Sequence, residues 1–148
     1  MNARDIMTFN PSVVTGRDTI TNAATIMRSL DIGLLPVVDT VESRHLIGVI
    51  TDRDIVVRCR AEGHQPDCAV QDHMTRQTLT TVTSEASLRE IADKMEYHQV
   101  RRLPVVDADN AVIGIVTQAD LARHVGPSDP KLVEKVVERI SAPAGALF

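Results

Sequence analysis

Two short motifs of the same type have the chemistry to hold a ligand. Thr51 and Asp54 form a Thr-x-x-Asp motif, and Thr117 and Asp120 form a second one further along the chain. A carboxylate can accept hydrogen bonds from two neighbouring hydroxyl groups, and a threonine hydroxyl can donate to a sugar or phosphate oxygen. These residue types therefore fit a ribonucleoside ligand.

The same motifs also have a structural interpretation. A threonine at a helix N-cap accepts a hydrogen bond from a first-turn amide, and an acidic side chain three residues later bonds back to the N-cap amide. Two features favour a ligand as well. The acid is Asp in both copies, although this cap prefers Glu or Gln, and each motif follows a predicted buried strand, at the end where open α/β sheets bind ligands. The two roles are compatible.

Both motifs belong to an internal repeat that covers most of the chain. Three sequence blocks occur twice in the same order, at nearly constant offsets of 67, 68 and 66 residues. The paired blocks are residues 5–8 and 72–75, 35–39 and 103–107, and 48–54 and 114–120. Recurrence in one order at one spacing indicates a duplicated structural unit.

Each copy predicts the element order strand, helix, strand, strand, helix. Apolar residues spaced three and four apart predict a first helix in each copy, with N-caps at Thr19 and Ser87. Continuous aliphatic runs predict strands that are buried on both faces. The expected strands are near 13–14, 35–38 and 46–50, and again near 81–82, 103–106 and 112–116. The closing helices are near 52–60 and 118–125.

A further helix is expected after the second copy. Gly126 and Pro127 end the preceding helix, and Pro130 suits the first turn of a new one. The new helix carries an apolar stripe made of Leu132, Val133, Val136, Val137 and Ile140. The stripe either covers the chain's own core or contacts a second copy of the chain, and we favour the contact.

The repeat length and the paired blocks resemble the CBS-domain family in its tandem form, the Bateman module, and in particular its small stand-alone bacterial members. The resemblance rests on the Leu-Pro-Val-Val-Asp and Gly-x-x-Thr-x-x-Asp blocks and covers nearly all of residues 1–126. It implies an α/β fold of two pseudo-symmetric β-α-β-β-α repeats packed sheet to sheet, plus a C-terminal helix. The expected domains are repeat 1 at 1–62, a linker at 63–71, repeat 2 at 72–126, and the C-terminal helix and tail at 127–148.

The resemblance implies a non-catalytic module that binds an adenine nucleotide, either AMP, ADP, ATP or NAD, and requires no cofactor. In the family the motif threonine contacts phosphate or sugar and the aspartate contacts the ribose hydroxyls. This assigns ligand-binding roles to Thr51, Asp54, Thr117 and Asp120. The module would sense energy or redox state and act in trans on an unknown effector protein. The resemblance also implies a homodimer.

Phosphate groups would need positive charge, because the chain has neither a P-loop nor a dinucleotide-binding glycine motif. The candidate cations are Arg101, Arg102 and Arg53, although a solvated surface is the alternative role for them. In the family, residues just before one repeat's Pro-Val block can reach the phosphate of the nucleotide held by the other repeat. By this rule Arg101 and Arg102 of the second copy face the nucleotide held by the first motif. The nucleotide held by the second motif faces Gly33 and Leu34, which carry no charge. We therefore expect the nucleotide held by the first motif to bind more tightly.

Composition argues against several functions. A net charge of -4 and a pI of about 5.7 argue against nucleic-acid binding, which needs a basic face. No apolar run approaches the roughly 20 residues of a membrane helix, and no signal-peptide core follows the N-terminus. We therefore expect a cytoplasmic protein without membrane contact. The chain lacks hydrolase, metalloprotease and kinase motifs, which predicts that it is not an enzyme.

The sequence leaves two alternatives open. A module that has lost its ligand would be a protein-interaction or stress protein, although both Thr-x-x-Asp motifs are intact. Cys59, His64 and Cys68, with His73 close by in the sequence, have the residue types of a zinc site. Their spacing is loose and matches no zinc or redox motif, so we predict no metal site.

Overall fold

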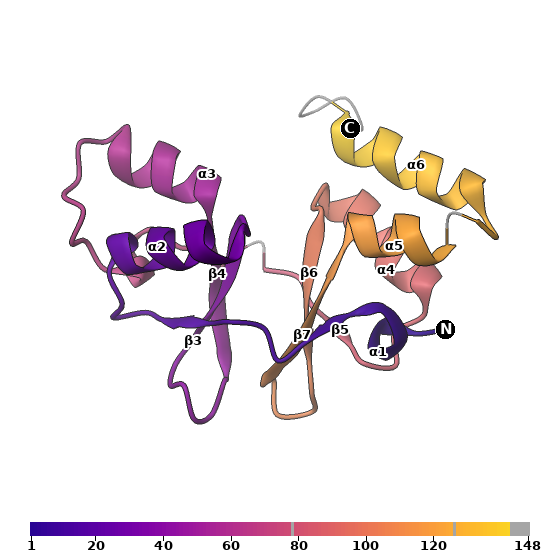
Figure 1. Ribbon diagram of the computed structural model, residues 1–148, viewed down its shortest axis with the longest axis horizontal. Coiled ribbons are helices and arrows are strands. Elements are labelled where there is room, and N and C mark those ends of the chain that lie inside the picture. Colours follow the sequence, from indigo (N-terminus) through magenta and orange to yellow (C-terminus); the bar gives the residue numbers. More distant parts are fainter. Residues whose placement is uncertain (78, 126, 143–148) are drawn as a thin grey trace. The chain divides into compact units, whose positions relative to one another are not determined.

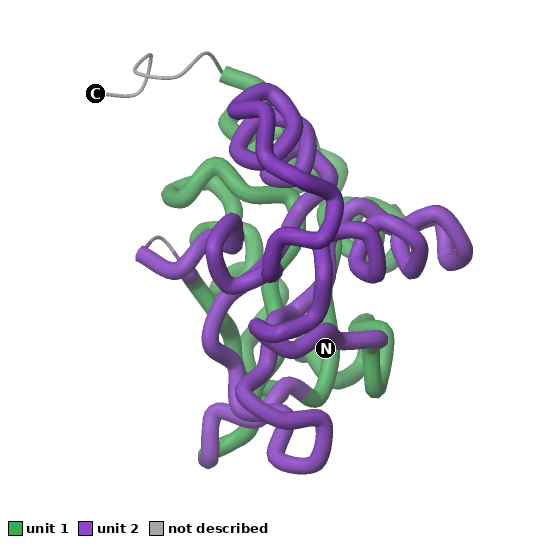
Figure 2. Tube along the Cα trace, turned by 90° about the vertical axis from the view of Figure 1, so that its left-hand side faces the viewer, with its two compact units in different colours: residues 1–11, 80–108, 113–148 green, residues 12–79, 109–112 purple. Residues whose placement is uncertain are grey.

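The computed structural model describes residues 1–77, 79–125 and 127–142. The chain forms two compact units, which Figure 2 shows in different colours. Unit 1 contains Met1–Pro11, Thr80–Ala108 and Ile113–Phe148, and unit 2 contains Ser12–Leu79 and Asp109–Val112. Gly126, which we expect to end a helix, and the tail at 143–148 lie outside the described residues.

Unit 2 is built on a three-stranded sheet. Strand β2 (Val14–Thr15) runs parallel to β3 (Leu34–Val38), which pairs antiparallel with β4 (Leu46–Thr51). Helix α2 (Ile20–Leu30) connects β2 to β3, and β4 leads into α3 (Asp52–Asp54) and the π-helix η1 (Ile55–Arg60) (Figure 1). A short 3-10 helix, η2 (Val70–Asp72), follows. Every residue of β3 is buried, as its aliphatic run predicts.

Unit 1 has a four-stranded sheet in the order β1-β7-β6-β5. Its strands are β1 (Thr8–Phe9), β5 (Val82–Thr83), β6 (Arg102–Val106) and β7 (Val112–Thr117), and its helices are α1 (Ala3–Ile6), α4 (Leu88–His98), α5 (Gln118–Val125) and α6 (Pro130–Ser141). The predicted α/β class and the element order of each repeat are confirmed. Among the described residues, no helix combines the length and apolar character that a membrane crossing requires.

The first helix of each repeat begins and ends in the same way. Thr19 and Ser87 each accept a hydrogen bond from the amide three residues later, at 3.0 and 3.1 Å, so both predicted N-caps are confirmed. The two helices then end at left-handed residues, Asp31 after α2 and Gln99 after α4. The repeated sequence therefore produces repeated local structure.

The Asp-x-Met-Thr blocks pack against glycines that come from the other sequence repeat. In unit 2, a Cβ atom added to Gly48 would lie 2.7 Å from Met74 Sδ and 2.9 Å from the Thr75 carbonyl oxygen. In unit 1, Met7 approaches Gly114 in the same way, and β1 pairs antiparallel with β7. Both contacts need a residue without a side chain. The compact units therefore differ from the sequence repeats in these segments.

The apolar stripe of α6 packs on its own unit. Val136 and Ile140 are 1% and 8% exposed, and α6 contacts both α4 and α5. Val137 is exposed. The interpretation of the stripe as a contact with a second copy is therefore wrong for Val136 and Ile140, because an amphipathic helix beside an apolar core buries its stripe there.

Candidate functional site

The first Thr-x-x-Asp motif lies at the end of β4. Thr51 Oγ1 accepts a hydrogen bond from the Asp54 amide at 3.1 Å, and Asp54 Oδ2 accepts one from the Thr51 amide at 3.0 Å. These reciprocal bonds form a capping box at the start of α3, so the structural role of the motif is present. The other carboxylate oxygen, Asp54 Oδ1, lies 3.5 Å from Arg58 Nε.

The second motif has the same arrangement at the end of β7. Thr117 Oγ1 accepts a hydrogen bond from the Asp120 amide at 3.1 Å, and Asp120 Oδ2 accepts one from the Thr117 amide at 2.8 Å. Asp120 Oδ1 lies 2.5 Å from Arg123 Nη2. The first corner is defined here as Thr51, Asp54 and Arg58, and the second corner as Thr117, Asp120 and Arg123.

The aspartates of both corners are buried. Asp54 and Asp120 are 8% and 5% exposed, and burying a carboxylate is unfavourable unless hydrogen bonds and opposite charge satisfy it. The capping bonds satisfy Oδ2, whereas Oδ1 is paired to an arginine whose side chain is 54% exposed at Arg58 and 69% exposed at Arg123. An exposed arginine is held weakly. A ligand hydroxyl that binds Oδ1 therefore displaces only a weak ion pair, whereas one that binds Oδ2 would compete with the capping hydrogen bonds.

Sequence reasoning does not identify Arg58, Arg123 or Thr75 as neighbours of the motifs. The two arginines lie four and three residues after their aspartates, and this helical spacing of opposite charges is a signal that could have found them. Thr75 Oγ1 donates to Asp54 Oδ2 at 3.4 Å from 21 residues away. No local pattern indicates this contact, because it depends on the bridge between Thr75 and Val49.

The three phosphate candidates are exposed, and within the described ranges none of their guanidinium groups forms a hydrogen bond or ion pair. Arg53 lies on α3. The Arg101 carbonyl accepts a hydrogen bond from the Gln118 amide at 2.8 Å, which places the start of β6 beside the second corner in unit 1. In unit 2, the Gly33 carbonyl accepts from the Asp52 amide at 3.0 Å. Arg101 and Gly33 therefore hold equivalent backbone positions in the two units. Contact of the three arginines with a phosphate stays a prediction.

The internal repeat and the paired corners have a counterpart among known proteins. The family model of the CBS domain matches residues 3–60 and 70–126. This chain belongs to the CBS-domain family. Hypoxic response protein 1 of Mycobacterium tuberculosis is 42% identical over 123 residues, which cover 83% of this chain and 84% of the relative. A crystal structure of Hypoxic Response Protein I with two coordinated zinc ions is 41% identical, has a TM-score of 0.75, and covers 84% of this chain and 98% of that one.

Two further similar CBS-domain structures contain adenosine compounds. The CBS domain pair of protein MJ0100, in complex with 5-methylthioadenosine and S-adenosyl-L-methionine, is 31% identical, with a TM-score of 0.74 and coverage of 83% of this chain and 98% of that chain. CBSX2 in complex with AMP is 29% identical, with a TM-score of 0.70 and coverage of 82% and 93%. The predicted family is confirmed, and some members of this family bind adenosine ligands.

Proposed function

We propose that this CBS-domain protein binds an adenine nucleotide at each corner and acts as a non-catalytic regulatory module on an effector protein in trans. The observation that carries the proposal is the duplicated corner, in which a buried aspartate has one capped oxygen and one oxygen paired to an exposed arginine. The complexes of similar CBS proteins with AMP and with S-adenosyl-L-methionine support an adenosine ligand.

Each residue type of a corner has a role in this proposal. The aspartate Oδ1 accepts hydrogen bonds from the ribose hydroxyls, and the arginine released from it turns to a phosphate oxygen. The threonine hydroxyl contacts a sugar or phosphate oxygen. Both corners lie at helix N-termini, where amide groups favour an anion. The exposed cations Arg53, Arg101 and Arg102 add positive charge for the phosphates.

The proposal covers AMP, ADP, ATP and NAD, since all four present the same adenosine to a corner. It also includes the homodimer that the family resemblance implies, although the stripe of α6 gives this dimer no support. Sedimentation of the protein at tens of micromolar measures the oligomeric state. A monomer at that concentration contradicts the dimer and leaves nucleotide binding to its own test.

Titration calorimetry with AMP, ADP, ATP and NAD tests nucleotide binding, with GMP as the control for the base. We expect at least one adenine nucleotide to bind with a Kd between micromolar and millimolar, about 4 to 8 kcal/mol of binding free energy. If all four ligands give no heat up to millimolar concentration, the proposal is wrong. The corners would then be helix caps in a ligand-free protein-interaction module.

A further inference from the structure

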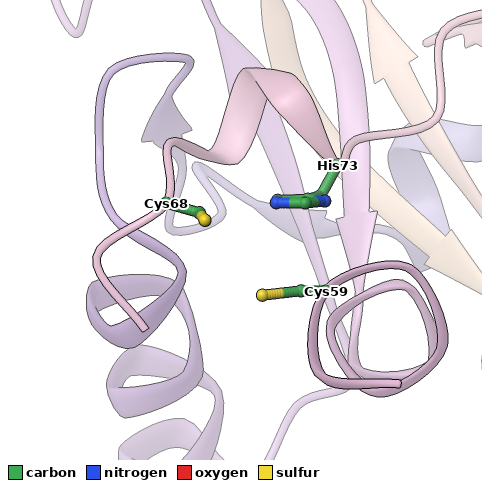
Figure 3. Close-up of side chains that lie close together, drawn as sticks. All are labelled: Cys59, Cys68 and His73. Atoms are coloured by element: carbon green, nitrogen blue, oxygen red, sulfur yellow. The ribbon is translucent and has the colours of Figure 1, made fainter. Parts of the chain in front are cut away.

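Three side chains of types that can bind a metal ion lie together in unit 2, on segments that follow the first corner in the sequence. The ligand atoms of Cys59, Cys68 and His73 all lie within 4.8 Å of one another. Figure 3 shows the three side chains approaching one another from separate segments: Cys59 from η1, Cys68 from the loop before η2, and His73 from the residue after η2. Both cysteines are free thiols, and Cys59 and His73 are 0% and 4% exposed. The cluster is therefore largely enclosed.

The unpartnered ring of His73 is evidence for a ligand that the described part of the chain does not supply. Its Nε2 atom is buried and has no hydrogen-bond partner among the described residues. A buried polar atom without a partner is unfavourable and rare in folded proteins. A disulfide between Cys59 and Cys68 would leave this nitrogen unsatisfied. A metal ion bound to both sulfur atoms and to Nε2 would satisfy it.

The thiols are in an environment that a cation would change. Burial raises the pKa of the Cys59 thiol and Cys68 raises it further, whereas Arg60 acts in the opposite direction. A divalent metal stabilises the thiolate, and each coordinating thiol releases its proton to solvent.

Backbone hydrogen bonds hold the two cysteines in place. The Ile20 amide donates to the Cys68 carbonyl at 2.9 Å, which fixes the loop against the start of α2. The His64 amide donates to the Cys59 carbonyl at 3.0 Å and closes the turn after η1. Two sulfur atoms bound to one tetrahedral zinc ion lie about 3.8 Å apart. Closing the cluster around a metal therefore needs only small side-chain movements.

We propose that Cys59, Cys68 and His73 bind a zinc ion. Two thiolates and an imidazole form a ligand set that zinc prefers, whereas magnesium and calcium prefer oxygen. The fourth ligand is a water molecule or the exposed imidazole of His64, whose ring centroid lies 4.9 Å from that of His73. The spacing of these residues in the sequence matches no zinc motif and therefore predicts no site. The residues come together only because the loop after η1 folds back onto Cys59.

The position of Cys59 makes this site specific to the first repeat. At the offset of 66 residues that relates Gly48 to Gly114, Cys59 corresponds to Val125, which is buried in the core of unit 1. A thiol thus stands where the second repeat has an ordinary core residue. Bound zinc would join the end of η1, which carries Arg58 of the first corner, to the segment that follows it.

Metal analysis of the tag-free protein, purified with a reducing agent, tests the proposal. After incubation with zinc and dialysis, elemental mass spectrometry should find about one tightly held zinc ion per chain. Cobalt(II) in place of zinc should produce sulfur-to-cobalt charge-transfer absorption, which requires thiolate ligands. If the reduced parent chain retains no zinc and shows no such absorption, the proposal is wrong, and no variant is needed to reject it.

Variants then assign the ligands. Cys68→Ser and His73→Asn should each lower zinc retention by about tenfold or more. His98→Ala removes an exposed histidine on α4 and is the control, which should retain zinc like the parent chain. Circular dichroism checks folding, and Cys68→Ser is decisive if the buried His73 variant does not fold. Unchanged zinc retention in folded Cys68→Ser, or equal loss in His98→Ala, contradicts the assignment.

Discussion

The two corners share a cap but differ in what else reaches the carboxylate. In the second corner, the Thr117 hydroxyl itself donates to Asp120 Oδ2 at 2.8 Å. In the first corner, the hydroxyl that donates to Asp54 Oδ2 is that of Thr75, at 3.4 Å. The motif therefore determines the cap in both corners. The additional hydroxyl on the aspartate comes from inside the motif in the second corner and from outside it in the first.

The helices that follow the corners differ more than the corners do. After the first corner, the chain continues as the π-helix η1, whose Val56 and Val57 are exposed. After the second corner, α5 is α-helical throughout and packs on α6. A π-helix is rare and frequently lies at a functional site. Equal motifs therefore do not imply equal sites, and this inequality can be tested by mutation.

The largest effect is expected where α6 covers the helix of the second corner. Ile140→Ala should lower the free energy of unfolding by about 2 to 5 kcal/mol, because it removes a buried side chain from the core of unit 1. Val137→Ala is the matched control on the same helix and should change it by less than about 0.5 kcal/mol, since Val137 is 42% exposed. Urea denaturation measures both. Equal effects would contradict the packing of α6 on its own unit.

A second test addresses the charge difference between the repeats. The sequence predicts that Arg101 and Arg102 strengthen the binding event that depends on Asp54. Replacing both arginines by alanine should weaken that event by on the order of tenfold or more, since a charge-assisted bond to phosphate contributes about 1.5 to 3 kcal/mol. Calorimetry with AMP at two salt concentrations measures the change, with the exposed Arg28→Ala as control. If the event that depends on Asp120 weakens instead, the prediction assigns these arginines to the wrong corner.

The glycines behind both corners should be equally intolerant of a side chain. A Cβ at Gly48 would meet Met74 Sδ at 2.7 Å and the Thr75 carbonyl oxygen at 2.9 Å. A Cβ at Gly114 would meet the buried Met7 side chain and, at 3.1 Å, the Thr8 carbonyl oxygen. Gly48→Ala and Gly114→Ala should therefore each lower the free energy of unfolding by about 1 to 3 kcal/mol. Gly63→Asn is the control, because no atom lies near that position and Asn tolerates its positive φ. A stable Gly48→Ala would contradict the close packing of the Asp-x-Met-Thr block.

The smallest effect is expected at the contact that is found only in the first corner. Thr75→Val removes the hydroxyl that donates to Asp54 and should lower the free energy of unfolding by about 0.5 to 1 kcal/mol. Thr8→Val changes the equivalent, exposed residue in unit 1 and should be nearly neutral. Thermal denaturation compares the two variants. A larger loss in Thr8→Val would reverse the difference between the corners.

Local structure was predictable because its causes lie within a few residues. The caps at Thr19 and Ser87 follow from side-chain hydrogen bonds across one helical turn. The strand that precedes each corner, β4 or β7, follows from a continuous aliphatic run. The capping boxes of Asp54 and Asp120 follow from a spacing of three residues.

The remaining features depend on contacts between segments that are distant in the sequence. Nothing near Met7 indicates that it packs on Gly114, and nothing near Thr75 indicates that it reaches Asp54. The stripe of α6 shows that one face is apolar and leaves open which surface covers it. The gathering of Cys68 and His73 around Cys59 depends on the path of the loop after η1, which a list of spacings does not contain.

Native mass spectrometry with AMP tests the central claim most directly. The parent chain should bind one AMP for each corner, Asp54→Asn and Asp120→Asn should each lose one of these events, and the double variant should bind none. Asn retains an oxygen for the capping bond and removes the negative charge, so the fold should persist. AMP bound equally well by the folded double variant, or not bound by the parent chain at millimolar concentration, would contradict nucleotide binding at the corners.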